Sequence, residues 1–182
     1  MFDRVYASIF RTDRSTVSAL SAYLSYPTAS LMLMPKTLDK LPSLAHTLAE
    51  RGYSTAYQYG GQIEGMGKGN YLRHAGFQQL ISAEDYALSD EESTNWGVSD
   101  SLSFHRVFDF LMEREQSGKP WLFGQQAIDS HEPWNVPFHA CENPVFNAFA
   151  YTDHHMGLLI ERLKRSPLWD NLLIIIYADH GF

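Results

Sequence analysis

An aspartate and a histidine, Asp179 and His180, directly follow the most apolar stretch of the chain. Residues 172–178 read Leu-Leu-Ile-Ile-Ile-Tyr-Ala, which predicts a strand buried on both faces of a parallel sheet. Side chains at the carboxyl end of such a strand enter the crevice where open α/β sheets bind ligands. A carboxylate beside an imidazole is a good ligand pair for a divalent metal ion. The pair could instead cap a turn, but its place after a central strand favours the metal interpretation.

A second group of polar residues, Phe10-Arg-Thr12-Asp-Arg14-Ser-Thr16, opens a predicted helix. A hydroxyl or carboxylate here most commonly caps the helix, and either Thr12 or Asp13 could do so. The other interpretation makes the Thr12 hydroxyl a nucleophile bound to a metal ion, which would lower its pKa. Arg11 and Arg14 favour the second interpretation, because a cap needs no cations near the positive end of a helix, whereas an anionic substrate does.

His131 follows another predicted strand, 121–128, and could donate a hydrogen bond to a phosphate or sulfate oxygen. It could equally be an exposed loop residue, and the sequence leaves both interpretations open. Within Asp153-His154-His155, we expect only one side chain to face a site, because adjacent helix residues point in different directions. The glycine-rich segment 60–69 lacks the spacing of a nucleotide-binding loop and is interpreted as a mobile loop beside the site.

The elements that must position these residues alternate between strands and helices. We expect helices over 17–24, 42–52, 71–75, 101–115 and 144–165, and strands over 5–10, 54–59, 77–81, 121–128 and 172–178. This order predicts an α/β fold with a mostly parallel sheet and helices on both faces. We expect residues 1–182 to form a single truncated domain whose sheet is incomplete at both ends.

Composition excludes several classes of protein. A net charge of −7 without a basic stripe argues against nucleic-acid binding. Cys141 is the only cysteine, so there is no intrachain disulfide. No apolar stretch reaches the roughly 18 to 20 residues that span a bilayer, and the charged start at Met1 does not resemble a signal peptide. If the parent protein is exported, its targeting segment lies outside these residues.

Several blocks, in this order, carry a family resemblance. They are Phe-Arg-Thr-Asp-Arg (10–14), Leu-Pro-Ser-Leu (41–44), Arg-Gly-Tyr (51–53), Tyr-Gly-Gly (59–61), Asn-Tyr-Leu-Arg-His-Ala-Gly-Phe (70–77), Trp-Gly-Val-Ser-Asp (96–100), Asp-Ser-His-Glu-Pro (129–133), Tyr-Thr-Asp (151–153), Leu-Trp-Asp-Asn (168–171) and Tyr-Ala-Asp-His-Gly (177–181). Together they resemble the sulfatase-like branch of the alkaline phosphatase superfamily, and within it the lipoteichoic acid synthase type.

This resemblance implies a site with one divalent metal ion, Mn²⁺, Mg²⁺ or Zn²⁺. Thr12 would be the nucleophile and a metal ligand, Asp179 and His180 would be further ligands, and His131 would contact the substrate. Thr12 would attack the phosphodiester of a phospholipid-type or envelope-polymer head group and form a phospho-threonine intermediate, which a hydroxyl or water then resolves. The parent would be membrane-anchored, with this domain outside the cytoplasm and membrane contact only through parts absent here.

The chain also departs from the family pattern. The remaining acidic ligand has no counterpart, because the chain begins downstream of the strand that carries it. The loop after Gly61 lacks the Trp and Arg of glycerol-phosphate polymerases, and Lys68 is the nearest cation. The segment from Cys141 to Pro144 does not match the formylglycine motif of sulfatases. Alternative functions are hydrolysis of sulfuric esters or phosphonates on the same scaffold, or a catalytically inactive module, and we expect the isolated residues to be inactive.

Overall fold

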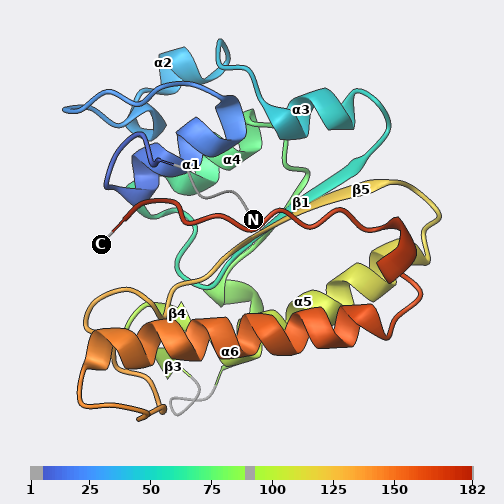
Figure 1. The fold of residues 1–182 in the computed structure, drawn as a ribbon. Coiled ribbons are helices and arrows are strands. Elements are labelled where there is room, and N and C mark those ends of the chain that lie inside the picture. The colour runs from blue at the N-terminus through green and yellow to red at the C-terminus, as the bar shows by residue number, and fades with distance from the viewer. Residues whose placement is uncertain (1–5, 89–92, 182) are drawn as a thin grey trace.

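A parallel sheet of three strands lies between two groups of helices in the computed structural model, which describes residues 6–88 and 93–181 (Figure 1). The strand order is β2 (Gln79–Ile81), β1 (Ser54–Tyr59), β5 (Trp121–Gln126). In the central strand, Ala56 pairs with Gln79 on one side and Phe123 on the other. A small hairpin of β3 (Ser93–Thr94) and β4 (Gly97–Val98) stands apart from this sheet. The predicted α/β class, with helices on both faces of a parallel sheet, is confirmed.

One face of the sheet is covered by short helices. They are α1 (Thr12–Ser21), η1 (Leu31–Leu33), α2 (Pro35–Leu38), α3 (Leu44–Ala49), η2 (Gly65–Gly67) and α4 (Lys68–His74) (Figure 1). Their apolar side chains form a core with Tyr57 of β1, whose ring meets the edge of Phe77 at 5.2 Å between centroids. Val17, Met32 and Leu72 are almost fully buried there. This core fixes the start of α1 relative to the sheet.

Two long helices, α5 (Asp100–Glu115) and α6 (Pro144–Lys164), cover the other face (Figure 1). The apolar stripe predicted for residues 101–115 packs against α6, with Phe104, Val107, Leu159 and Leu163 buried between them. Short 3₁₀ turns, η3 (Ala83–Asp85) and η4 (Trp169–Asn171), complete the described elements. In the parts of the chain that are described, no helix is both long and apolar enough to cross a membrane.

Most predicted elements form close to the expected positions, and the largest shift is at α1. That helix begins at Thr12, five residues before the predicted start, because Arg11 is extended and Thr12 already has helical geometry. It ends at Ala22, whose left-handed φ of 51° stops the helix before residue 24. The helix predicted from residue 71 also begins earlier, at Lys68.

The predicted terminal strand does not form. Residues 172–178 are extended but belong to neither sheet, and Leu173 and Ile175 are 83% and 71% exposed. Their composition favours extended backbone, but a strand also needs a hydrogen-bonding neighbour, and none of the described strands provides one. For the same reason the strand predicted over 5–10 is absent from residues 6–10, while Val5 lies outside the described residues. Figure 1 shows the C-terminal segment ending at the side of the sheet where α1 lies.

Candidate active site

The Thr12 hydroxyl faces a residue that is distant in the sequence. Its Oγ1 lies 3.2 Å from Nε2 of His180, 168 positions along the chain. Arg11, not Thr12, occupies the N-cap position, and the cap has no side-chain hydrogen bond. The capping alternative therefore does not hold for Thr12 or Asp13. As the first residue of α1, Thr12 lies at the positive end of the helix dipole, which stabilises negative charge on its oxygen.

The ring nitrogens of His180 have two different neighbours. Its Nδ1 lies 2.8 Å from the carbonyl oxygen of Gly181, which can only accept, so Nδ1 carries the ring proton. In the neutral ring, Nε2 then has a free lone pair toward Thr12. The Oδ2 atom of Asp179 lies 3.7 Å from the same Nε2, and its Oδ1 accepts the His180 backbone N–H at 3.0 Å. A hydroxyl, a carboxylate and an imidazole thus converge on one point.

This donor set fits a divalent cation. Carboxylate, imidazole and alkoxide groups are ligands of Zn²⁺ and Mn²⁺, and Nε2 is in the tautomer that coordination requires. Within residues 6–88 and 93–181 there is no cluster of three or more His, Cys, Asp or Glu side chains suited to a metal ion.

Lys68 brings a positive charge to the same place. It is the first residue of α4 and is only 5% exposed, with Nζ 3.6 Å from the centroid of the Tyr59 ring. Nζ donates to Oε1 of Gln126, at the carboxyl end of β5, over 2.7 Å. Burial lowers the pKa of Lys68 to about 8, while the nearby carboxylates of Asp179 and Asp13 act to raise it. The ammonium group therefore interacts with residues on both sides of the Thr12–His180 contact.

The chain direction that buries Lys68 depends on Gly67. This residue has a φ of 74°, and a Cβ there would lie 2.7 Å from the carbonyl oxygen of Met32. The segment interpreted as a mobile loop is instead a 3₁₀ turn followed directly by α4. Gln126 was not identified from the sequence. Its signal was a pair of polar residues, Gln125 and Gln126, inside an otherwise apolar predicted strand.

Arg14, predicted to bind substrate, is hydrogen-bonded elsewhere. Its Nη1 donates to the carbonyl of Pro27, in the loop after α1, rather than to Asp179, His180 or a neighbouring acid. Arg11 is largely exposed and lies 4.0 Å from Asp13. Lys68, by contrast, is near enough to Asp179 for that carboxylate to act on its pKa.

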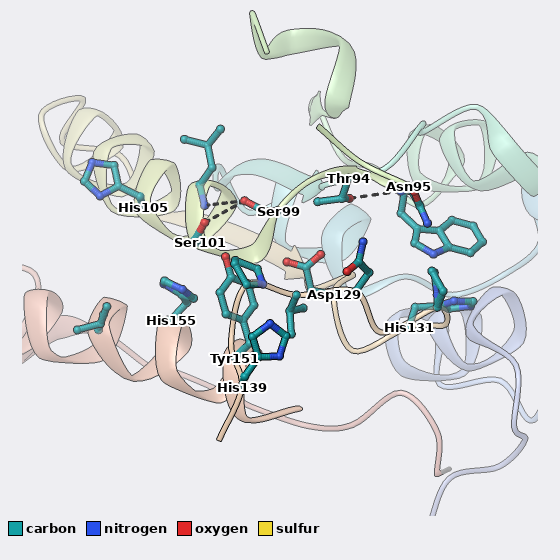
Figure 2. Close-up of a pocket in the computed structure, with 17 residues that line it drawn as sticks. Thr94, Asn95, Ser99, Ser101, His105, Asp129, His131, His139, Tyr151 and His155 are labelled. Atoms are coloured by element: carbon teal, nitrogen blue, oxygen red, sulfur yellow. Dashed lines mark hydrogen bonds between the residues drawn. The ribbon is translucent and has the colours of Figure 1, made fainter. Parts of the chain in front are cut away.

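His131 lies in the loop after β5 and lines a cavity of about 840 Å³ (Figure 2). Its Nδ1 is 2.9 Å from the Glu132 carbonyl oxygen, and its ring meets Trp96 at 4.4 Å. Thr12 and His180 are not among the residues that line this cavity, so His131 is separate from their contact. The connection between the two places is β5 itself, because Gln126 contacts Lys68 and His131 follows five residues later.

Other polar residues line the same cavity. His155 of α6 faces it together with Tyr151, His139 and Asp129, whereas His154 and Asp153 line a small hollow on another side of α6 (Figure 2). Burial lowers the pKa of His155 and raises that of Asp129 to about 6, the latter helped by the nearby charge of Asp100. Sequence reasoning missed Asp100 and Asp129 as site residues. Asp100 lies in block 96–100 and Asp129 in block 129–133, two of the blocks that carry the family resemblance, and these blocks could have pointed to both residues.

Comparison with known proteins identifies the family. The sulfatase family model matches residues 1–182, so the chain belongs to the sulfatase family. A curated relative, phosphoglycerol transferase I of Xanthomonas axonopodis pv. citri, is 24% identical over 164 residues, covering 83% of this chain and 23% of the relative. The chain thus spans about a quarter of that relative's length.

Two solved structures share the fold. The lipoteichoic acid synthase LtaP from Listeria monocytogenes superposes with a TM-score of 0.83 at 18% identity, over 92% of this chain and 44% of that chain. A protein of the alkaline phosphatase superfamily from Vibrio parahaemolyticus gives 0.83 at 23% identity, over 93% of this chain and 43% of that chain. The resemblance to the sulfatase-like, lipoteichoic acid synthase-type branch is confirmed.

Proposed function

We propose that these residues are part of the catalytic domain of a metal-dependent phosphotransferase that acts on a phospholipid-type or envelope-polymer head group. The contact between Thr12 Oγ1 and His180 Nε2, with Asp179 beside it, carries the proposal. The similarity to a phosphoglycerol transferase supports phosphoglycerol as the transferred group. Transfer to water instead of a hydroxyl acceptor would make the protein a phosphodiesterase.

In the first step Thr12 Oγ1 attacks the phosphorus of the donor. A bond forms between Thr12 Oγ1 and phosphorus, and the bond to the donor's leaving oxygen breaks. The Thr12 hydroxyl gives up its proton and the leaving oxygen takes one up, so the protons balance. The positive end of α1 stabilises the attacking oxygen, and Lys68 balances charge on the phosphoryl group. An acceptor hydroxyl then attacks the phospho-threonine, transfers the group to itself and restores the Thr12 hydroxyl. His131 contacts the substrate from the loop after β5.

One divalent ion, Mn²⁺, Mg²⁺ or Zn²⁺, would be held by Thr12, Asp179 and His180, and would lower the pKa of the hydroxyl. We place the missing acidic ligand outside residues 1–182. The complete protein would be membrane-anchored with this domain outside the cytoplasm, and it would recognise an anionic head group rather than a nucleic acid. The coverage of less than half of the solved chains supports a larger domain.

The test is phosphodiester turnover by the complete protein with added Mn²⁺, before and after Thr12→Ala. We expect turnover to be lost. Thr47→Ala is the matched control, because the Thr47 hydroxyl donates to the Ser43 carbonyl within α3, away from the site, and its loss should leave turnover unchanged. Unchanged turnover in Thr12→Ala would remove the nucleophile from the proposal.

A second candidate is hydrolysis of sulfuric esters, because the family model that matches the whole chain is named for sulfatases. The same arrangement of hydroxyl, carboxylate and imidazole can serve another tetrahedral anion. A panel of aryl sulfates and phosphodiesters separates the two candidates. Turnover of sulfates alone would replace the first proposal.

A further inference from the structure

Two buried carboxylates, Asp100 and Asp129, hold the chain that leads to His131. Asp100 is fully buried at the start of α5. Its Oδ1 accepts the Ile128 N–H at 2.9 Å, and its Oδ2 accepts the Asp129 N–H at 3.2 Å. Oδ2 also accepts the hydroxyl of Thr152, on α6, at 2.6 Å. In return, Asp129 Oδ2 accepts the Asp100 N–H at 2.7 Å. These bonds join the exit of β5 to both long helices.

The arrangement requires a carboxylate at residue 100. All three partners of Asp100 are donors, so every bond needs an acceptor, and an amide would place its own N–H₂ against one of them. Burial raises the pKa of Asp100, which shows that desolvation opposes the charged form. A buried carboxylate of this kind is retained only with its hydrogen bonds made, and removing one partner leaves a costly unpaired group.

The same network continues to the backbone of His131. The His131 N–H donates to the Ile128 carbonyl at 3.0 Å, so the turn that presents the ring starts from a residue that Asp100 holds. The ring itself packs on Trp96, whose indole N–H donates to the Glu132 carbonyl at 2.6 Å. His131 is thus held through its backbone by Asp100 and through its ring by Trp96, while it remains exposed to the cavity.

We infer that Asp100, with Thr152 behind it, is a positioning residue for His131. The inference rests on the proposed function in one respect, namely that His131 contacts the substrate. Asp100 faces the backbone of 128–129 rather than the cavity, so it acts through the His131 loop and not on the substrate. Loss of its bonds would release the backbone of 128–129 and allow the imidazole to move, and small misplacements of a contact residue reduce turnover strongly.

The first experiment does not depend on activity. Hydrogen exchange of peptides covering 127–133 is measured by mass spectrometry in the complete protein. Asp100→Asn should speed exchange of the Ile128 or the Asp129 amide by about tenfold or more, because the side-chain N–H₂ replaces the acceptor of one of them. Asp109→Asn is the matched control: the same change on the same helix, but at a carboxylate that is 52% exposed and paired with Arg162. Equal exchange in both variants would overturn the inference.

Where Asp100→Asn does not fold, Thr152→Val replaces it, since it removes one donor at nearly constant volume. Thr152→Ser keeps the hydroxyl and should restore slow exchange. Loss of protection in Thr152→Ser equal to that in Thr152→Val would mean that packing, not the hydrogen bond, matters, and would contradict the inference.

The second experiment is a double-mutant cycle on turnover of the complete protein. Thr152→Val should lower kcat/KM about tenfold alone, but should have little further effect once His131→Ala is present, because both changes remove the same contact. Additive losses would assign Thr152 and Asp100 a general structural role instead. If the unmodified protein turned over no phosphodiester, the proposed function would fail, while the exchange experiment would still decide the positioning claim.

Discussion

The two parts of the candidate site are held in different ways. The His131 loop is fixed by backbone hydrogen bonds to a fully buried carboxylate, so its geometry is built into the fold. The segment that carries Asp179 and His180 is extended, largely exposed and not paired into either described sheet. Its link to α1 is a side-chain contact of 3.2 Å. The His131 loop is therefore held by the buried interior of the fold, whereas the segment with Asp179 and His180 has few such constraints.

The largest effect is expected at the less constrained part. His180→Ala should lower kcat/KM of the complete protein by at least about 10³-fold, because both the hydroxyl's partner and a metal ligand are lost. His74→Ala is the control, since that imidazole pairs with Asp39 and lies at the other end of α4 from Lys68. A loss of less than tenfold in His180→Ala would contradict the assigned role.

Lys68 separates binding from chemistry. Lys68→Gln should raise KM for an anionic donor by about tenfold, since the proposal uses this buried cation to balance the charge of the phosphoryl group. Lys164→Gln changes an exposed lysine that pairs with Glu161, and it should have no effect on KM. Steady-state kinetics with both variants makes the comparison, and an unchanged KM in Lys68→Gln would remove Lys68 from the site.

Burial of Asp129 beside the His131 loop should make the stability of the folded protein depend on pH. The pKa of Asp129 is about 6 in the folded protein, against about 4 in an unfolded chain. The folded state therefore keeps a proton that the unfolded chain has lost, so this contribution to stability is present below pH 4 and is lost as pH rises through 6. The neighbouring titratable groups are Asp100, whose charge acts on Asp129, and His155 of α6, whose charge acts on Asp100.

Asp129→Asn removes that titration and keeps an oxygen for the Asp100 N–H. The unmodified protein loses stability from pH 5 to pH 8 and the variant does not. The free energy of unfolding of the variant, relative to that of the unmodified protein, should therefore be higher at pH 8 than at pH 5 by on the order of 1 kcal/mol. The change in stability is measured at both pH values from the urea concentration at which peptides of α5 lose their protection from hydrogen exchange. Asp109→Asn is the control. A gain that is equal at both pH values would show that Asp129 does not titrate in this range.

The smallest expected effect concerns hydrogen exchange, and it compares the two parts of the candidate site directly. Removing divalent metal with a chelator should speed amide exchange of residues 172–181 several-fold, and should leave residues 128–131 unchanged, because only the first segment carries metal ligands. Exchange mass spectrometry of the complete protein reports both segments at once. Equal responses would mean that the two parts are not held differently.

Much of this arrangement could be predicted from local sequence. The polar residues at a predicted helix start and after the apolar segment 172–178 singled out Thr12, Asp179 and His180, and Thr12 and His180 do lie in contact, although that segment is not part of the sheet. Local pattern could not show that residues 172–178 lack a pairing neighbour, because pairing depends on chain elsewhere. It also could not show that Arg14 turns to Pro27.

The buried polar residues were the least predictable. Asp100 reads as an ordinary helix-start aspartate, and only the structure shows that its acceptors serve the backbone of another element. Gln126 is a polar residue inside the predicted strand 121–128, yet its amide oxygen accepts from both Lys68 and Tyr57. Such roles depend on which donors the fold brings within reach, and no local periodicity encodes them.

The most direct measurement is to quench the complete protein with acid during turnover of a phosphoglycerol donor and to map the peptides by mass spectrometry. The account predicts a phosphoglycerol adduct on the peptide that contains Thr12, localised to its hydroxyl and absent after Thr12→Ala. An adduct on another residue, or turnover with no adduct at any quench time, would contradict it.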